Sequence, residues 1–409
     1  MENKFMNQES IIDLLESQGL DPIAKGDTSS LIISEKIIRC EAGDTLIAGM
    51  GSNKGKDDQI HLVVDAVHLC LQAKCEKKFL RLIFGRRKNE NEQAEVENAV
   101  ALMIENIKIP LKIETEVDGE KIEFKSESLN EDDNCRIERW ISDLIEERNV
   151  PKFAKDLENA IGNDMFKWYR SVTGTYWSGR VAGLEVCRVD RNLAVEWGEL
   201  KVGSPGKYGN GQARNVFHKI IKEKVEEGFF PREQIEIVSS VIREIAESRG
   251  NKNGELAKFQ REHLLESYVL SGKVEIISQA GVLRPALGDY PFQFPTLWGP
   301  KGAPRFVDAL MRCGDVPYVV ELKEPSGFSR GQGYRHAITQ AVLYREFVRR
   351  AEKVQPWFIN KGLAPDKCRA IVAFPELPKG DKKKQMLLNQ HMLVGNAFGV
   401  EIIEIKGFE

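Results

Sequence analysis

Residues 305–325 read RFVDALMRCGDVPYVVELKEP, and this stretch decides how the C-terminal part of the chain folds. Two segments within it, Arg305–Leu310 and Pro317–Leu322, are apolar and rich in β-branched or aromatic residues, as strands are. Between them Arg312–Asp315 reads RCGD, a composition typical of a tight turn. The stretch therefore predicts two neighbouring strands of one sheet.

Further helix and strand patterns surround these two strands in a distinctive order. Apolar residues recur at helical spacing on both sides, and short apolar runs mark additional strands. The expected helices are Glu255–Leu270, Gly333–Val354 and Lys382–Phe398, and the expected strands are Val274–Ser278, Ala370–Phe374 and Glu401–Ile405. The order α-β-β-β-α-β with a closing α-β predicts a mixed α/β fold, in which helices pack on the faces of a mixed sheet.

The upstream part of the chain is expected to form further domains, because 409 residues exceed what one hydrophobic core usually organises. The acidic run Ser126–Asn134 and the polar, Gly-containing run Arg249–Gly254 lack a hydrophobic repeat and mark boundaries. The predicted domains are an N-terminal α+β module at 1–130, a mainly helical module at 131–250 and a third domain at 251–409.

Two local structures are predicted within the upstream modules. Asp118-Gly119 tolerates the positive φ angles of a tight hairpin turn, so a hairpin is expected to reverse there. Phe166–Val172 is expected to be a short helix.

Composition bounds the class of protein. The chain is 42% hydrophobic and 30% charged, which is the balance of an ordinary globular protein. No apolar run approaches the roughly 20 residues that span a bilayer, and the first residues carry no export signal. The seven cysteines are odd in number and scattered, which favours reduced thiols over a disulfide framework. The sequence therefore indicates a cytoplasmic protein without a membrane partner.

Charge is distributed unevenly along the chain, whose formal net charge is −3. From Asn251 to the end there are 23 Lys and Arg against 17 Asp and Glu, a balance of +6, which leaves 36 against 45, or −9, for the rest. A moderately basic C-terminal part is compatible with a polyanionic partner and equally with a solvated surface.

Three ionisable residues meet at the ends of the two central strands. Asp308 follows one apolar run, and Glu321 and Lys323 flank Leu322 at the end of the other. Because side chains of a strand alternate between faces, Glu321 and Lys323 point the same way, and a hairpin brings Asp308 beside them. Two carboxylates so close repel each other unless a cation offsets them.

Magnesium fits this group because it prefers oxygen ligands and lowers the pKa of a bound water, which can then attack phosphorus. Lys323 would position or deprotonate that water, or stabilise the charge that develops on phosphorus. The alternative for Glu321 and Lys323 is an exposed, salt-bridged strand face without catalytic meaning.

Asp308, Glu321 and Lys323 resemble the D…ExK signature of the PD-(D/E)xK nuclease superfamily, with Val307 where a proline often precedes the aspartate. The resemblance implies a restriction-endonuclease-like α-β-β-β-α-β core, phosphodiester hydrolysis, and Mg²⁺ as cofactor with Mn²⁺ as a substitute. It also implies that Glu255 on the first helix is a metal ligand beside Asp308 and Glu321. The alternative for Glu255 is a favourable first-turn interaction with the helix dipole.

Gln340 and Tyr344 resemble the Q-x-x-x-Y element that some branches of the superfamily carry on the helix after the lysine. Residues spaced by four share a helix face, which can turn toward the active centre. The resemblance implies a catalytic role for Gln340 and a nucleic-acid contact for Tyr344. The alternative for Tyr344 is a core position with a satisfied hydroxyl.

The segments GELAKFQREHL, VVELKEP and ITQAVLY are together most similar to the Shedu antiphage defence nucleases. The similarity covers about Gly254–Glu409 and nothing upstream. It implies a DNA endonuclease in antiphage defence, regulated by its N-terminal region and assembled as a homo-oligomer. Two other classes stay open: a sequence-specific restriction or DNA-repair nuclease, and a nuclease-fold protein that has lost catalysis and binds or senses DNA.

Cations near the predicted centre are candidates for DNA contacts. Arg330 and Arg335 lie in and beside the Gly-rich segment SGFSRGQGYR, which can approach a phosphate backbone closely. The arginines between 345 and 350 extend the following helix and are better explained as a solvated face. The loop that holds Phe292 and Trp298 covers a core edge more readily than it stacks on bases.

A second acid-to-ExK pattern lies upstream. Glu185 precedes Glu199 and Lys201, and Gln212 follows. This copy is the true site, a degenerate duplication or a coincidence. The downstream copy is favoured because it has an aspartate, a more apolar strand and the complete order of elements.

Overall fold

The computed structural model describes residues 5–23, 36–73, 76–142, 152–170, 176–190, 200–201, 229–230, 235–251, 261–286, 294–324, 332–377, 380 and 382–408. The chain is a mixed α/β protein with mixed sheets, as predicted. It divides into two compact units. Unit 1 is Met1–Cys135, Ile276–Ala286 and Phe294–Lys406, and unit 2 is Arg136–Glu275, Leu287–Gln293 and Gly407–Glu409. The first predicted domain and most of the third therefore belong to one unit.

The first sheet of unit 1 is a βαβαβ arrangement with an antiparallel strand added at each edge. Its elements are β1 Ile38–Ala42, β2 Thr45–Met50, β3 Phe79–Phe84, β4 Lys112–Val117, β5 Glu120–Lys121, α1 Gln8–Ser17, α2 Lys56–Gln72 and α3 Glu90–Glu105. The strand order is β1-β2-β3-β4-β5, in which β2, β3 and β4 run parallel and α2 and α3 connect them. Helix α1 packs Ile11 and Leu15 against Ile47 and Ile83.

The second sheet of unit 1 contains the hairpin that the central stretch predicts. Its elements are β13 Arg284–Pro285, β16 Ala309–Cys313, β17 Val316–Leu322, β18 Arg369–Pro375, β19 Val400–Ile405, α11 Gln332–Arg350, α12 Gln355–Asn360 and α13 Lys382–Ala397. The strand order is β13-β16-β17-β18-β19. Strands β16 and β17 are antiparallel and turn at Gly314, whose φ is 60°, while β17, β18 and β19 are parallel.

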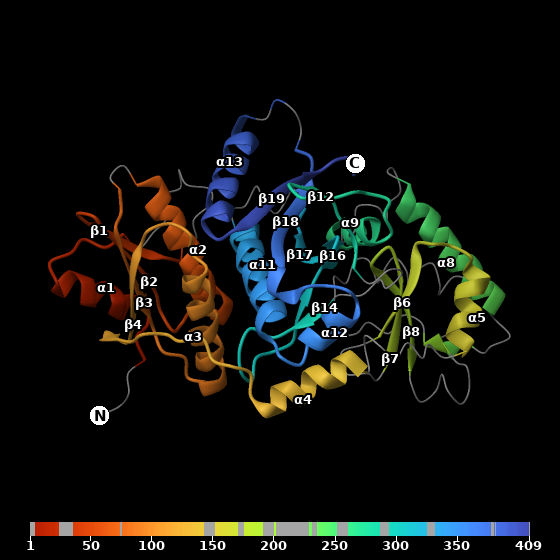
Figure 1. The fold of residues 1–409 in the computed structure, drawn as a ribbon, viewed down its shortest axis with the longest axis horizontal. Coiled ribbons are helices and arrows are strands. Elements are labelled where there is room, and N and C mark those ends of the chain that lie inside the picture. The colour runs from red at the N-terminus through yellow and green to blue at the C-terminus, as the bar shows by residue number, and fades with distance from the viewer. Residues whose placement is uncertain are drawn as a thin grey trace. The chain divides into compact units, whose positions relative to one another are not determined.

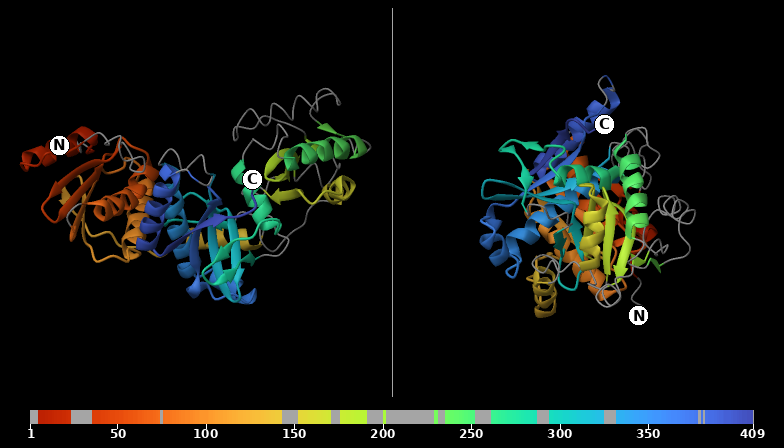
Figure 2. Two further views of the ribbon diagram at one scale, coloured as in Figure 1. Left: turned by 90° about the horizontal axis from the view of Figure 1, so that it is seen from above. Right: turned by 90° about the vertical axis from the view of Figure 1, so that its right-hand side faces the viewer.

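Helix α2 joins the two sheets of unit 1. All residues from Gln59 to Cys70 are buried, whereas a helix on a surface buries only one stripe. One side of α2 meets β2 and β3, and other sides meet α11 and α13. Figures 1 and 2 both show the orange N-terminal segment packed beside the blue C-terminal segment. The N-terminal region and the predicted nuclease core therefore share one interior.

Arg335 is the polar centre of the contact between α2 and α11. Its side chain is 1% exposed, and its guanidinium lies 2.7 Å from Asp65 Oδ2 and 3.2 Å from Asp58 Oδ1. Burial raises the pKa of Asp65 to about 6, and Arg335 acts in the opposite direction by favouring the carboxylate. A charge removed from water is costly unless it is paired, so these groups fix how the two helices meet.

Unit 2 is built on an antiparallel sheet. Its described elements are α5 Lys152–Ile161, β6 Phe166–Arg170, β7 Tyr176–Val181, β8 Leu184–Asp190, β9 Leu200–Lys201, β10 Phe229–Phe230, α8 Ile235–Gly250 and α9 Arg261–Leu270. The strand order is β10-β9-β8-β7-β6. Helices α5 and α8 pack apolar residues such as Leu157 and Ile245 against Phe166 and Trp168. The middle of the chain, predicted as mainly helical, thus contains a five-stranded sheet.

Local predictions had mixed outcomes. The hairpin at Asp118-Gly119 is confirmed, because both residues have positive φ angles between β4 and β5. The helix predicted at Phe166–Val172 is wrong, since Phe166–Arg170 is strand β6. Its aromatic residues suit a pleated, half-buried surface, and pairing with β7 outweighs a short helical pattern. Among the described residues, no helix is long and apolar enough to cross a membrane.

The first prediction concerns Arg335. Arg335→Met leaves Asp65 buried without its cation and should lower the free energy of unfolding by about 3–5 kcal/mol. The control Arg86→Met removes an exposed guanidinium 4.0 Å from Asp118 and should change stability by less than about 0.5 kcal/mol. Adding Asp65→Asn to Arg335→Met should recover part of the loss. Urea unfolding measures all four proteins, and equal stability of Arg335→Met and Arg86→Met would contradict the assignment.

The second prediction concerns pH. Burial lowers the pKa of His68 on α2 to about 4 and that of His391 on α13 to about 3. Both imidazoles are therefore neutral in the folded chain at a pH where the unfolded chain binds protons. Stability should be full above the ordinary value of 6.5 and fall as the pH drops below it, by about 2 kcal/mol per histidine at pH 5.

Hydrogen exchange of the α2 amides between pH 7.5 and 5, corrected for the intrinsic exchange rate, measures this loss. The double variant His68→Asn/His391→Asn should show a flatter dependence than the wild type. An unchanged slope in that variant would show that these two histidines do not cause the acid sensitivity.

Candidate active site

Asp308 lies where one strand ends and another begins. β15 (Arg305–Val307) pairs with β14 (Phe294–Thr296), whereas β16 pairs with β17 in the larger sheet. The strand predicted at Arg305–Leu310 is therefore two short strands that belong to different sheets. This interruption takes the aspartate out of the regular ladder and frees its side chain for a specific contact.

The hairpin register sets Asp308 against the end of β17. Ala309, the first residue of β16, is opposite Val320, so Asp308, just before the ladder begins, lies near the level of Glu321. The Oδ2 atom of Asp308 accepts a hydrogen bond from the backbone N–H of Leu322 at 2.9 Å. The predicted convergence of Asp308 with the ExK strand is confirmed as geometry.

Glu321 and Lys323 form a shielded ion pair. The Glu321 side chain is 1% exposed and that of Lys323 13%, and Lys323 Nζ lies 2.7 Å from Glu321 Oε1. Leu322 between them is fully buried. The prediction that the two charged side chains share one face of the strand is confirmed, and the exposed surface pair considered as its alternative is not what the structure contains.

Gln340 and Tyr344 lie on the face of α11 that turns toward these carboxylates. The Nε2 atom of Gln340 donates to the Tyr344 hydroxyl at 3.2 Å. Burial raises the pKa of Tyr344, and the carboxylates of Glu321 and Asp308 raise it further. Both acids therefore act electrostatically on the tyrosine of the QxxxY pair.

Arg305 was missed by sequence reasoning. Its guanidinium lies 2.7 Å from Asp57 Oδ1 and 3.5 Å from Glu95 Oε1. It also covers the ring of Trp298 at 4.3 Å from the centroid and acts electrostatically on Tyr344. These partners of Arg305, on α2 and α3, lie some 200 residues or more away in sequence, so no local sequence pattern predicts them. Its position three residues before Asp308 was the one available signal.

The acids of the first turn of α2 act on the same region as the motif lysine. Burial lowers the pKa of His336 to about 4, Arg335 and Lys323 lower it as well, and Asp57 and Asp58 act in the opposite direction. Charges of α2 and of the motif lysine therefore act on the pKa of the same histidine at the start of α11.

Two predicted nucleic-acid contacts need correction. Arg335 is buried and bonded to Asp58 and Asp65, so its guanidinium is not available to a phosphate backbone. Tyr344 is 1% exposed and its hydroxyl accepts from Gln340, which matches the core alternative. In both cases the physical reason is the packing of α11 against its neighbours in unit 1.

Other predicted residues divide between core and undescribed segments. Trp298 is 2% exposed and packs with Tyr344 at 6.2 Å between ring centroids, so it belongs to the core. Arg345 is buried and bonds the carbonyl oxygens of Phe398 and Gly399, so it is not on a solvated face. Glu255, Arg330 and Phe292 lie outside the described residues.

The donor set fits magnesium in part. Asp308 and Glu321 supply two carboxylates, which with backbone carbonyls and water are the ligands that Mg²⁺ prefers. Within the described part of the chain, no group of three or more His, Cys, Asp or Glu is arranged to hold a metal. Glu255, which the resemblance implies as a further ligand, lies in the undescribed segment 252–260.

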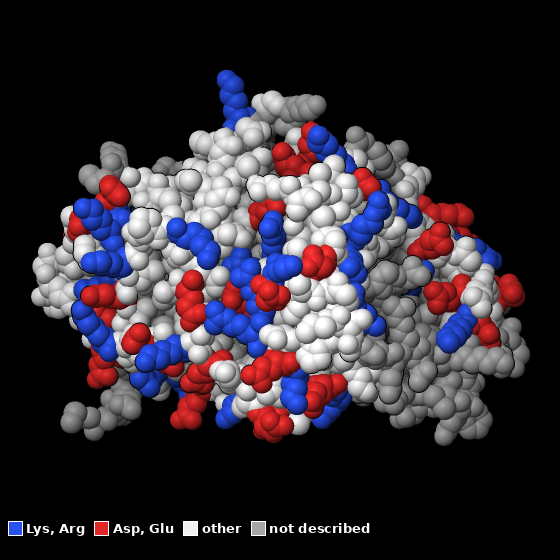
Figure 3. Space-filling model, viewed as in Figure 1, with Lys and Arg blue, Asp and Glu red and all other residues white. Residues whose placement is uncertain are grey.

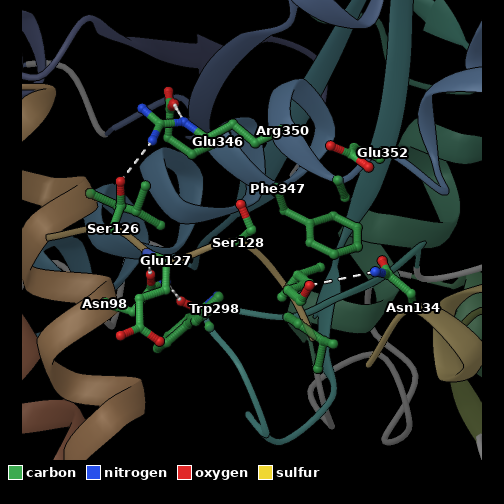
Figure 4. Close-up of a pocket in the computed structure, with 15 residues that line it drawn as sticks. Asn98, Ser126, Glu127, Ser128, Asn134, Trp298, Glu346, Phe347, Arg350 and Glu352 are labelled. Atoms are coloured by element: carbon green, nitrogen blue, oxygen red, sulfur yellow. Dashed lines mark hydrogen bonds and ion pairs between the residues drawn. The ribbon is translucent and has the colours of Figure 1, made fainter. Parts of the chain in front are cut away.

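A cavity of about 170 Å³ lies beside this centre and not within it. Figure 4 shows Asn98 bonded to the carbonyl of Trp298, and Arg350 bonded to Ser126, around its wall. None of the predicted catalytic residues lines the cavity. Trp298 contributes both to the cavity wall and to the surroundings of Arg305, whose guanidinium lies over its ring.

On the face drawn in Figure 3, the surface charge forms no single positive region that would attract a polyanion. Blue and red side chains are interspersed there among the coloured residues. A DNA contact on that face would depend on individual cations more than on a broad field.

The upstream ExK copy falls largely outside the described residues. Glu199 and Gln212 are not described. Lys201 lies in β9 opposite Arg188 of β8, and Glu185 lies opposite Arg180 of β7. The alternative that this copy is the true site therefore stays open.

Comparisons of the chain with family models, with curated proteins and with solved structures give no match. The resemblance to PD-(D/E)xK nucleases therefore rests on the sequence motif alone. The geometry of Asp308, Glu321, Lys323, Gln340 and Tyr344 is an independent reason to consider these residues together.

Proposed function

We propose that the chain is a magnesium-dependent DNA endonuclease whose centre is formed by Asp308, Glu321 and Lys323. The observation that carries the proposal is their meeting at the end of β17, where Asp308 bonds the N–H of Leu322 and Lys323 bonds Glu321. A buried lysine–glutamate pair opposite a second carboxylate gains little stability on its own. Its presence is better explained by chemistry.

Each residue has a role that its position supports. Asp308 and Glu321 would hold the ion, with Glu255 as a further ligand, and magnesium when bound would supply Lewis-acid activation of water and offset the phosphate charge. Lys323 holds Glu321 in place and presents an ammonium to the charge that grows on phosphorus. Gln340 and Tyr344, which bond to each other on α11, would help to orient the carboxylates.

The arrangement of elements supports a restriction-endonuclease-like core as part of this proposal. Strands β16, β17 and β18 with helix α11 follow the expected β-β-α-β order, and β19 extends the sheet. The described helix α9, which corresponds to the expected first helix, belongs to unit 2. A role in antiphage defence and assembly as a homo-oligomer follow from the Shedu resemblance.

Regulation by the N-terminal region is the second part of the proposal. Asp57 pairs with Arg305, and Asp58 pairs with Arg335 and with Lys36 at 2.6 Å. Carboxylates in the first turn of α2 thus pair with cations close to the candidate centre. These cations would otherwise be available to phosphates of DNA. Release of these pairs would make Arg305, which is 24% exposed, available to DNA.

The third prediction is loss of DNA cleavage. Glu321→Gln, Asp308→Asn and Lys323→Met should each lower the rate of plasmid and linear duplex cleavage with Mg²⁺ by about a thousandfold. The control Asp315→Asn changes an exposed acid at the hairpin turn, paired with Lys367 at 2.9 Å, and should keep the wild-type rate.

Three outcomes would change this assignment. If Glu199→Ala abolishes cleavage while Glu321→Ala does not, the upstream ExK copy is the active site. If the wild type binds DNA and leaves every substrate intact with Mg²⁺ or Mn²⁺, the chain is a binding or sensing protein with a nuclease-like fold. Cleavage at fixed sequences would instead identify a restriction or repair nuclease.

The fourth prediction concerns Asp57. Asp57→Asn removes the ion pair with Arg305 and should raise the rate of duplex cleavage about fivefold at low salt, as expected for a pair of about 1 kcal/mol. The control Asp132→Asn removes an exposed acid of the same unit on the helix at Glu131–Trp140. A rate for Asp57→Asn at or below that of the control would argue against restraint by α2.

A further inference from the structure

An open cavity of about 350 Å³ lies at the amino ends of β18 and β19. Its lining comes from the segment after α3, from Gln279, from the last turns of α11 and α13 and from the starts of both strands. The lining residues are Lys108, Gln279, Arg345, Arg349, Arg369, Ala370, Asn396, Gly399, Val400 and Glu401. Its volume is within the range of small-ligand sites.

The lining is strongly cationic. It carries four basic side chains, Lys108, Arg345, Arg349 and Arg369, against one acid, Glu401. The Oε1 atom of Glu401 already accepts the backbone N–H of Gln279 at 2.8 Å. The buried Glu346 behind the wall offsets one further positive charge. An excess of positive charge remains.

The four cations differ in what already holds them. Arg345 is 3% exposed and donates to the carbonyls of Gly399 and Phe398 and to Asn106, which makes it a rigid floor. Arg349 donates through Nε to the carbonyl of Cys368. Lys108 and Arg369 are exposed and form no ion pair with any residue that the structure describes.

The cavity is separate from the candidate active centre. Arg369 begins β18, whereas Glu321 lies level with Val372 and Leu322 with Ala373, further along the strand. The three residues of strand from Arg369 to Val372 correspond to roughly 10 Å. A ligand bound at the start of β18 would therefore not contact Asp308 or Glu321.

We propose that this cavity binds a phosphate-bearing anion. Guanidinium groups offer paired donors that match phosphate oxygens, and ammonium adds a point charge. A pre-ordered Arg345 lowers the entropic cost of binding, while the exposed side chains of Lys108 and Arg369 would supply further positive charge to the ligand. The size admits more than one phosphate, so the source is a nucleotide or consecutive phosphates of a nucleic-acid backbone.

Binding there would join the two sheets of unit 1. Lys108 follows α3 of the first sheet, and its backbone N–H donates to the carbonyl of Ala397 at 2.7 Å, next to the second sheet. The other three cations belong to the second sheet and to α11. An anion held between them would add a second link between the two sheets of unit 1, besides the ion pairs of Arg335 with α2.

The test is calorimetric titration of the full chain with sodium tripolyphosphate in EDTA, so that it does not depend on cleavage. Lys108→Ala/Arg369→Ala should weaken binding at least tenfold. The control Lys121→Ala/Lys367→Ala removes two exposed cations of the same unit and should bind as the wild type does. Both pairs are exposed, so thermal unfolding should be unchanged, and Glu321→Gln should also bind normally.

Hydrogen exchange then locates the ligand and its source. Protection of residues 397–401 by ATP assigns a nucleotide, and protection by a 20-base-pair duplex alone assigns the nucleic-acid backbone. The proposal is overturned if wild-type protein does not bind tripolyphosphate, if Lys108→Ala/Arg369→Ala binds it as tightly as the wild type, or if protection appears at residues 321–323 and not at 397–401.

Discussion

The pairing of Arg335 with Asp65 and Asp58 is the constraint on which the rest of unit 1 depends. A guanidinium at 1% exposure needs both partners, and they lie on α2, some 270 residues earlier in the chain. The pairing therefore fixes α11 in rotation and height against α2. Because α11 also connects β17 to β18, its position decides where Gln340, Tyr344 and the arginines of its last turns lie. One buried ion cluster thus influences both the candidate active centre and the cationic cavity, because residues of the same helix contribute to each.

The second constraint is the interruption of the strand at Asp308. A continuous strand would have placed the aspartate in a regular ladder with its side chain on a fixed face. Instead, β15 belongs to a separate two-stranded sheet. The Asp308 carboxylate accepts the hydrogen bond from the N–H of Leu322 that a backbone carbonyl would otherwise accept. The carboxylate is thereby held at the end of β17 by the backbone itself. Such placement on rigid elements is what a catalytic group requires.

Sequence reasoning succeeded where short-range periodicity carries the information. Alternation along a strand sufficed to put Glu321 and Lys323 on one face, and a spacing of four sufficed to put Gln340 beside Tyr344. It failed where the environment of a residue depends on a partner far away in the sequence. Arg335 follows a Gly-rich segment and was assigned to DNA, yet acids of the N-terminal region bury it. The role of Arg305 was not predicted for the same reason, since its partners also lie in the N-terminal region. In β6, pairing with β7 overrode a local helical pattern that five residues could not establish.

The N-terminal region is therefore part of the folded core that carries the candidate site. Without α2, the buried face of α11 would meet water, Arg335 would lose both acids, and Arg305 would lose Asp57. The free energy that holds α11 in register with β17 comes partly from that contact, since a helix owes most of its stability to tertiary packing. In the proposed regulation, a signal that loosens α2 would act on the packing of α11 and on the ion pairs of Arg305 and Arg335 together. Such regulation would require no separate switch, because the helix that completes the core also carries Asp57 and Asp58.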